Sequence, residues 1–373
     1  MYLRTIPTDM LTPRLVLPRA WYREHHPLGY ALAPLARLFC LAVSARRFAY
    51  RNRLVATHHP GVPVIVVGNI TAGGTGKTPL IIWLANFLRA HHFRPAIIVR
   101  GYGGKADHWP QEARADTDPY LVGDEAVLLA RRAACRVMAA PDRVAGARAL
   151  IARADCNLIL SDDGLQHYAL ERDLEIAVTD GVLGHGNGRC LPAGPLREPV
   201  SRLATVDFVI KHLPFHGHED PEQRPGGNTM GAATEWTMRL IPGDPRDVAS
   251  GRVTRPLDSF RALPVHAVCG IGHPERFFRT LRQLGLDIRP HAFPDHHAFL
   301  PRDLAFEDGL PILMTEKDAV KCRRFADPRC WYLPVEAEPE PAFGPRLLRA
   351  LWNLGSFSPE ISPKVSPKIP SGY

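Results

Sequence analysis

The chain has 373 residues, enough for about two domains, and its hydrophobic fraction of 45% is that of a soluble or peripheral protein. Seven scattered cysteines form no C-x-x-C pair, which argues against a zinc knuckle or redox motif and favours reduced thiols in the cytosol. The net charge of +8 resembles a nucleic-acid signal, but nine arginines against Asp9 and Glu24 place nearly all of it in residues 1–60. We therefore expect no nucleic-acid partner.

The basic excess coincides with an amphipathic segment. Apolar residues recur at three- and four-residue steps from Leu28 to Ala42, which predicts a helix with one apolar face. Pro34 and Arg37 interrupt the run, which falls short of the ~20 apolar residues of a transmembrane span. No cleavable signal peptide is evident. Because Arg46, Arg47, Arg51 and Arg53 follow and suit anionic headgroups, we expect residues 1–55 to hold a membrane-associated helix. The alternative is a core-packed helix with a solvated basic end.

Residues 62–79, VPVIVVGNITAGGTGKTP, combine a buried strand, a glycine-rich turn and an apolar helix. Gly73, Gly74 and Gly76 have no Cβ, so their N–H groups can approach a polyphosphate at the positive end of the helix. We expect Lys77 to reach the β- and γ-phosphates and the Thr78 hydroxyl to bind Mg²⁺.

The usual pattern G-x-x-x-x-G-K-T requires glycine at position 71, where this chain has Thr71, so the motif is a variant. A glycine-rich structural junction is the alternative, but GKT after VIVVG makes a chance match improbable. The residues expected to bind the nucleotide are Thr71, Ala72, Gly73, Gly74, Thr75, Gly76, Lys77 and Thr78.

Strand-like and helical runs alternate from Val62 to about Leu203, which predicts a parallel sheet wrapped by helices. The expected fold class is α/β, with a P-loop NTPase-like domain over residues 56–205. Ligands gather at the carboxyl ends of the strands in such a sheet. Unusual polar strings follow three of the predicted strands: GNITAGGTGKT, RGYGG and SDDGLQH.

Two acidic pairs stand at the ends of predicted elements. Asp162 and Asp163 follow an apolar strand, where adjacent carboxylates are costly without a cation, so we expect a link to Mg²⁺. A turn former and helix cap before Gly164 would explain one aspartate but not both. Asp124 and Glu125 open a helix, where capping is the commoner role and catalysis the alternative.

A polar, glycine-rich loop at residues 216–234 separates two strands, VDFVIKH and EWTMRL, and we expect a linking β-hairpin over 206–240. Residues 241–355 again show strand, turn and helix, which predicts a second, smaller α/β domain. Its string FPDHHAF is either a capped turn or a site for a tuned base, and in TEKDAVK Lys317 either begins a helix or contacts phosphate. The tail at 356–373, rich in Ser, Pro and Lys, is expected to be disordered.

Taken in order, these strings resemble the tetraacyldisaccharide 4'-kinases of lipid A biosynthesis. The resemblance extends from about Trp21 to Gly355 and includes GNITAGGTGKTP, RGYGG, VGDEAVLLA, SDDGLQH, LPAGPLREP, GIGHPERFF, FPDHHAF and TEKDAVK. Thr71, which departs from the general phosphate-loop pattern, is similar to this family's own form of the loop.

The resemblance implies that MgATP phosphorylates the 4'-hydroxyl of an acylated glucosamine disaccharide 1-phosphate at the cytoplasmic face of the inner membrane. It implies that Lys77 and Thr78 hold the phosphates and Mg²⁺, that Glu125 and Asp162 complete the metal environment, and that Asp124 is the general base. His296 would pair with that base, with His297 as the alternative. Contacts to the lipid are implied for Arg100, Asp163, Gln166 and Arg197. No obligate protein partner is expected.

A different class of protein also fits a phosphate loop. A GTPase or ATPase switch would use its bound nucleotide to control a protein partner. No string resembling the guanine-reading N-K-x-D appears in a suitable loop, and the basic amphipathic N-terminus suits a lipid substrate better.

Overall fold

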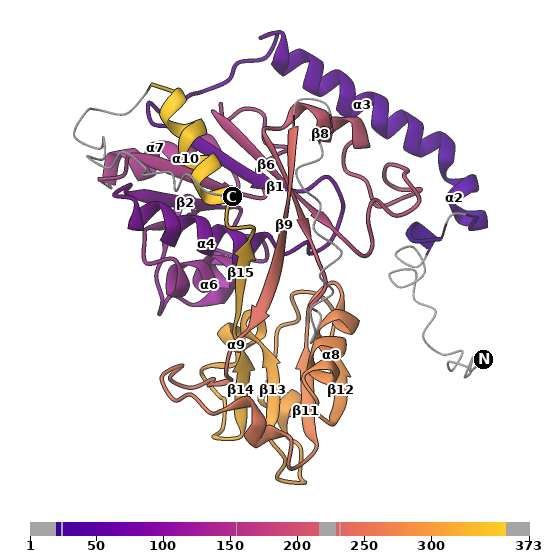
Figure 1. The fold of residues 1–373 in the computed structure, drawn as a ribbon, viewed down its shortest axis with the longest axis vertical. Helices are drawn as coiled ribbons and strands as arrows, with labels where there is room; N and C mark the ends of the chain where they lie inside the picture. The colour runs from indigo at the N-terminus through magenta and orange to yellow at the C-terminus, as the bar shows by residue number, and fades with distance from the viewer. Residues whose placement is uncertain (1–19, 24, 154, 216–228, 231–232, 356–373) are drawn as a thin grey trace, which may run out of the picture.

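The structure is a computed structural model that describes residues 20–23, 25–153, 155–215, 229–230 and 233–355 (Figure 1). The predicted tail at 356–373 and most of the predicted loop at 216–234 lie outside the described residues. Two sheets form the fold, a large one above and a smaller one below in the view of Figure 1.

The larger sheet has the strand order β15-β9-β7-β6-β1-β5-β2-β4-β3, and all neighbours from β9 to β4 pair in parallel. β3 and β15 add antiparallel edges, and the short β8 pairs antiparallel with β9. The bounds are β1 Val64–Gly68, β2 Pro95–Val99, β3 Gln111–Ala113, β4 Val137–Ala139, β5 Leu158–Asp162, β6 Leu174–Asp180, β7 Phe208–His212, β8 Thr229–Met230, β9 Ala233–Pro242 and β15 Val335–Pro339. The predicted α/β class with a parallel-rich sheet is confirmed.

Helices cover both faces of this sheet, because its central strands are apolar on both sides. Leu80, Val127 and Leu347 pack into one core from α4 (Lys77–Ala90), α6 (Asp124–Arg132) and α10 (Phe343–Asn353). The opposite core includes Val144 and Leu150 of α7 (Arg143–Arg153). All five residues of β1 are buried, which fixes the start of the phosphate loop firmly in the molecule.

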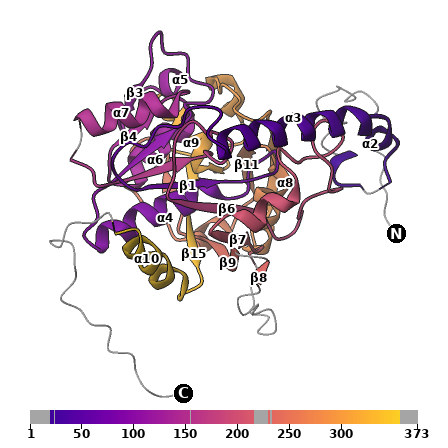
Figure 2. The ribbon, with the colours of Figure 1, turned by 90° about the horizontal axis from the view of Figure 1, so that it is seen from above.

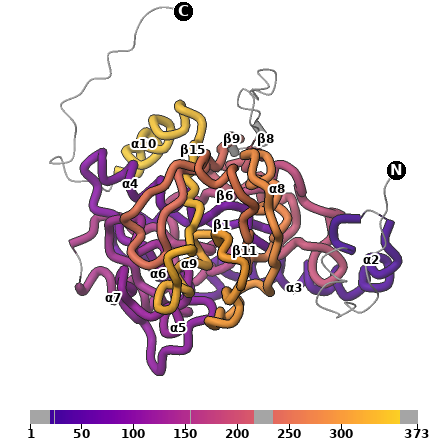
Figure 3. Tube along the Cα trace, turned by 90° about the horizontal axis from the view of Figure 1, so that it is seen from below, coloured from indigo at the N-terminus to yellow at the C-terminus, as the bar shows by residue number. Residues whose placement is uncertain are grey.

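The second domain is a smaller sheet of order β10-β14-β13-β11-β12, parallel except for β10. Its two faces bury separate apolar clusters, one of which includes Phe278 and Leu281 of helix α8. The bounds are β10 Arg246–Asp247, β11 Val265–Cys269, α8 Pro274–Gln283, β12 Ile288–Ala292, β13 Ile312–Thr315, α9 Glu316–Cys322 and β14 Cys330–Leu333. Figure 3 shows this domain from below, in front of the larger one.

The structure corrects the predicted connection between the domains. β7 and β9 are neighbours, but they run parallel, so residues 206–240 do not form the expected hairpin. The chain also returns: β15 pairs with β9 and α10 packs against α4, so residues 335–353 complete the larger domain. Two chain segments therefore cross between the domains, as Figure 1 shows for β9 and β15.

The N-terminal segment forms α2 (Pro27–Ala31) and α3 (Ala33–Arg51), which extend beyond the body of the larger domain in Figure 2. Pro34 does not break the helix, because it lies in the first turn of α3, where a backbone N–H has no helical partner. None of the described helices is long and apolar enough to cross a membrane.

Candidate active site

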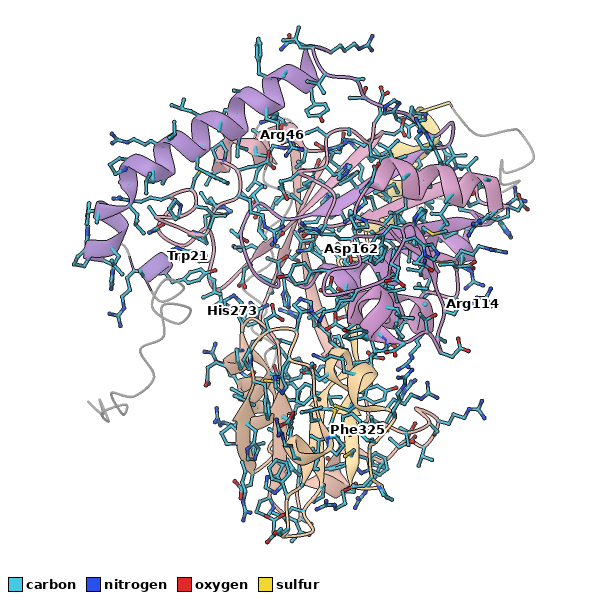
Figure 4. All side chains as sticks on the ribbon, turned by 180° about the vertical axis from the view of Figure 1, so that it is seen from behind. Trp21, Arg46, Arg114, Asp162, His273 and Phe325 are labelled. Atoms are coloured by element: carbon cyan, nitrogen blue, oxygen red, sulfur yellow. The ribbon has the colours of Figure 1, made fainter. Side chains whose placement is uncertain are left out.

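A cleft of about 640 Å³ lies between the two domains. The larger domain lines it with the phosphate loop and with residues after β2, β5, β6 and β7, the carboxyl edge where α/β sheets bind ligands. The second domain contributes one face of α8 and the residues just before it, the loop at 295–296 and the start of α9. Figure 4 shows Asp162 in the larger domain and His273 at the end of the second domain that faces it.

The phosphate loop depends on glycine at two positions. Gly73 and Gly76 have φ values of 112° and 92°, which residues with a Cβ rarely adopt. A Cβ on Gly76 would also lie 3.2 Å from Nδ1 of His212. Residues 73–78 line the cleft at the N-terminus of α4, an arrangement that suits a phosphate group.

Two of the residues predicted to bind the nucleotide are not part of the cleft wall. The Ala72 N–H donates to the Pro195 carbonyl at 2.7 Å, so it is already occupied. Thr71 is buried, and its backbone forms an isolated antiparallel β-bridge with Leu196. It is absent from the described residues with positive φ, which explains why position 71 accepts a side chain. Thr71 and Ala72 therefore anchor the loop to the LPAGPLREP segment, and their contact with the nucleotide stays a prediction.

Lys77, which lines the cleft, is positioned by two side-chain oxygen acceptors. Its Nζ lies 3.0 Å from Asn69 Oδ1 and 3.2 Å from Asp163 Oδ1. Arg197 Nη1 lies 2.9 Å from Asp163 Oδ2. Burial alone would raise the pKa of Asp163, but the charges of Lys77 and Arg197 hold it well below its usual range. Asp163, Arg197 and Arg100 all line the cleft, as expected for residues close to a substrate.

Asp162 is a buried carboxylate with one oxygen that has no partner among the described residues. The residue is 2% exposed, and that oxygen is Oδ1. Burial and the nearby charge of Glu125 raise its pKa to about 7. A buried, unpartnered carboxylate oxygen is costly unless a ligand satisfies it, and Mg²⁺ prefers such oxygens.

The three predicted metal ligands, Thr78, Glu125 and Asp162, all line the cleft. Their side chains offer hydroxyl and carboxylate oxygens, the type of ligand that Mg²⁺ prefers. No group of three or more His, Cys, Asp and Glu side chains within the described part of the chain could hold a metal alone. Phosphate oxygens and water would have to supply the remaining positions, which is the usual way in which Mg²⁺ binds with a nucleotide.

Asp124 and His296 meet across the domain boundary. His296 Nδ1 lies 3.1 Å from Asp124 Oδ2, although the two residues are far apart in the sequence. Gly123, at φ 88°, places Asp124 in the first turn of α6, where a Cβ on Gly123 would lie 2.5 Å from the Tyr102 carbonyl. His296 itself has a left-handed backbone with φ 58°, a strained conformation that is concentrated at functional sites.

The protonation of this pair follows from its neighbours. Lys317 Nζ lies 3.3 Å from His296 Nε2 and 3.0 Å from Glu125 Oε1. An ammonium group only donates, so the network assigns Nε2 as acceptor and Nδ1–H as donor to Asp124. Burial alone would raise the pKa of Asp124, but His296, Lys317 and Lys321 outweigh it and hold the pKa below its usual range. Asp124 is therefore ionised and able to accept a proton.

The adjacent histidine has a different partner. His297 Nε2 lies 2.9 Å from Asp303 Oδ2, a residue of its own domain. Neither His297 nor Asp303 lines the cleft. Of the two histidines in FPDHHAF, the geometry brings His296 to the site.

Gln166 does not line the cleft. Its Nε2 donates to the Glu198 carboxylate at 2.8 Å and lies 3.2 Å from the Asn69 carbonyl. Glu198 is buried and also accepts from Tyr168. Gln166 therefore holds the backbone beside the phosphate loop, and its contact with the lipid stays a prediction.

Comparison with known proteins identifies the family. A family model described as tetraacyldisaccharide-1-P 4'-kinase matches residues 28–352. The chain belongs to this family. It is 53% identical over 333 residues to the tetraacyldisaccharide 4'-kinase of Nitrosococcus oceani, which covers 89% of this chain and 93% of that protein. It is 48% identical over 343 residues to the enzyme of the same name from Alkalilimnicola ehrlichii, with 92% and 98% covered.

A solved structure has the same fold. The crystal structure of an "apo" form of LpxK from Aquifex aeolicus, in complex with ATP, matches with a TM-score of 0.70 at 26% identity. The match covers 87% of this chain and 99% of that chain. The family resemblance seen in the motifs is thus confirmed.

Two residues at the site, Asn69 and Arg276, were not singled out from the sequence, and Lys317 was considered only as a helix start or a phosphate contact. Asn69 contacts Lys77, Lys317 joins Glu125 to His296, and Arg276 of α8 contacts the phosphate loop. Lys317 and Arg276 stand in strings that resemble family motifs, TEKDAVK and GIGHPERFF. A charged residue in the first turn of a helix is also common on solvated surfaces, so the sequence held no stronger signal.

Proposed function

We propose that this chain is a tetraacyldisaccharide 4'-kinase, which transfers the γ-phosphoryl group of ATP to the 4'-hydroxyl of tetraacyldisaccharide 1-phosphate. Its family membership and the ATP bound to the Aquifex aeolicus structure support this function. The observation that carries it is the ionised Asp124, paired with His296 at a cleft that also contains a phosphate loop.

The acceptor hydroxyl is a poor nucleophile, so it needs a base and a correct position. Asp124 would accept its proton, and the Nδ1–H of His296 would fix the orientation of the carboxylate. Asp124 lies just behind His296 and Glu125, which line the cleft, and is only 5% exposed. Movement of the second domain, which carries His296, would therefore open the path from the hydroxyl to this carboxylate.

Phosphoryl transfer also requires that negative charge be neutralised. Lys77 and the loop amides would hold the β- and γ-phosphates, as the loop geometry favours. Mg²⁺, held by Thr78, Glu125 and Asp162, would supply further positive charge when bound. Arg100, Asp163 and Arg197 also line the cleft and are candidates to contact the sugar and its substituents.

The direct test is phosphorylation of the lipid. Purified protein with Mg²⁺ and radiolabelled ATP should transfer label to the tetraacyl disaccharide 1-phosphate in mixed micelles. ATP binding without transfer would reject the kinase and favour the switch, which should instead hydrolyse nucleotide without lipid. A matched disaccharide whose 4'-hydroxyl is replaced by hydrogen should accept no label, which checks the position of transfer.

We further propose that α3 binds the inner membrane at its cytoplasmic face. An apolar stripe on this helix faces solvent: Leu35, Leu38, Leu41 and Phe48 are 55%, 65%, 68% and 62% exposed. Arg37 and Arg51 beside it are also exposed and suit anionic headgroups. Arg47 differs from expectation, because it donates to Thr205 of the larger domain and so anchors the helix.

Replacing Leu38 with Glu should lower binding to vesicles of phosphatidylethanolamine and phosphatidylglycerol by about tenfold, because one leucine contributes roughly 1.5–3 kcal/mol when buried in an apolar phase. Co-sedimentation measures the bound fraction. Leu263→Glu is the matched control, since Leu263 is a leucine of the second domain that is 57% exposed and gains the same charge away from α3. Equal losses in both variants would indicate simple repulsion by the anionic lipid rather than insertion of the stripe.

A further inference from the structure

The first turn of α8 places an arginine of the second domain against the phosphate loop. One guanidinium nitrogen of Arg276 pairs with the Asp180 carboxylate at the end of β6. The other lies 3.5 Å from the Gly74 carbonyl and 3.4 Å from His212 Nδ1. Arg276 thus joins three groups of the larger domain, and both Arg276 and Asp180 line the cleft.

Two histidines lie beside Arg276 at the phosphate loop, and neither adds a positive charge there. Burial, and the charge of Arg276 itself, lower the pKa of His212 to about 4, so its ring is neutral. Burial likewise lowers the pKa of His273, which lies beside Gly73. Neither imidazole competes with Arg276 for an anion at neutral pH.

The ion pair between Arg276 and Asp180 can be broken at low cost, so that Arg276 could bind another anion. Asp180 Oδ1 already accepts the backbone N–H groups of Val182 and Leu183, at 2.9 and 3.0 Å. The carboxylate would therefore stay partly satisfied if Arg276 moved away. The Arg276 side chain is 32% exposed, so it has space to move within the cleft.

We propose that Arg276 is a phosphate-binding residue, supplied by the second domain, that leaves Asp180 to contact the β- and γ-phosphates of ATP. This inference rests on the proposed function, because it requires ATP in the loop. A guanidinium group donates two parallel hydrogen bonds to phosphate oxygens, and a polyphosphate carries more charge than one carboxylate. Since Arg276 begins the helix that faces the loop, the same contact would draw the second domain toward the nucleotide.

The test measures the binding of ATP and AMP to the full chain without lipid, by calorimetry with Mg²⁺. Arg276→Ala should weaken ATP binding by about 10- to 100-fold, the usual loss for hydrogen bonds to a charged group. AMP has no β- or γ-phosphate, so its affinity should change by less than about threefold. Arg282→Ala is the matched control, because Arg282 lies on the same helix and does not line the cleft.

The competing explanation is that Arg276 only holds the two domains together through Asp180, and Asp180→Asn distinguishes the two explanations. Asparagine can still accept from the two backbone N–H groups but holds Arg276 less strongly, so ATP should bind as well as in the wild type or better. If Arg276 only tied the domains together, Arg276→Ala and Asp180→Asn would weaken both nucleotides alike, and the proposal would be overturned. Unchanged ATP binding by Arg276→Ala would overturn it as well.

A third variant protects the test against misfolding. Arg276→Lys keeps the positive charge but loses the planar guanidinium group that donates two parallel hydrogen bonds. It should therefore bind ATP several-fold more weakly and AMP normally. Should Arg276→Ala fail to fold, an ATP-specific loss in Arg276→Lys would support the proposal and an equal loss for AMP would reject it. The lipid assay decides the proposed function separately, because a chain that shows these binding effects but phosphorylates no lipid would contradict only the kinase.

Discussion

Asp124→Asn is expected to lower kcat by about 10² or more, the usual contribution of a general base, while ATP binding is retained. The structural reason is the ionised state of Asp124, which His296, Lys317 and Lys321 maintain against its burial. Asparagine has nearly the same shape and can still accept the Glu125 N–H that Asp124 Oδ1 binds at 2.8 Å. It cannot take a proton from the acceptor hydroxyl. Initial rates with the tetraacyl disaccharide at saturating ATP measure the effect.

A second Asp–His pair in the same chain provides the control. Asp303 and His297 form a pair of similar geometry that does not line the cleft. Asp303→Asn should change kcat by less than about threefold, since it touches neither the base nor the nucleotide. If the two asparagine variants lost activity equally, the loss would reflect general damage to an ion pair and Asp124 would not be the base.

His296 is expected to act through Asp124, which a double-mutant cycle can show. His296→Ala should reduce kcat on its own and cause little further loss in the Asp124→Asn background, because residues that act as a unit are not additive. His297→Ala should be close to wild type in both backgrounds. Full additivity of His296→Ala and Asp124→Asn would assign the histidine a separate role.

The sequence predicted those parts of the fold that local patterns encode. Alternating apolar strands and helices gave the parallel sheet, and VIVVG before a glycine-rich turn located the phosphate loop next to a buried strand. It did not predict that β9 runs parallel to β7, because strand direction depends on partners and not on the residues of either strand. The return of β15 and α10 to the larger domain was missed for the same reason.

The candidate site was predicted unevenly. Lys77, Thr78 and Asp162 follow from the phosphate-loop pattern and the end of a strand, since their chemistry requires those places. Asp124 looked at least as much like a helix cap, and only the family resemblance favoured it as the base. Its pairing with His296 joins two domains, so no local pattern could contain it. Gln166 contacts Glu198 and the backbone in this structure, a role that a polar residue near a strand end can equally have, and its contact with the lipid stays a prediction.

Lys77→Ala is expected to lower kcat/KM by about 10²–10³, the loss seen when one preorganised donor to a developing charge is removed. In the structure, Lys77 Nζ is held by Asn69 and Asp163, and the side chain is only 13% exposed. It therefore enters the reaction already in place. Lys105→Ala is the control, because Lys105 is exposed and stacks on Tyr120 at 4.9 Å from the ring centre.

The neighbours of Lys77 make its role separable from that of a structural ion pair. Without Lys77, the Asp163 carboxylate would keep Arg197 as its partner but would face the phosphates with one positive charge fewer. Asp163→Asn introduced into Lys77→Ala should then recover part of the lost kcat/KM, because it removes a negative charge that repels ATP. A structural pair would show the reverse, since removal of both partners would leave the loop less ordered than removal of either. Rates of the wild type, Lys77→Ala, Asp163→Asn and the double variant at subsaturating ATP decide between these two behaviours.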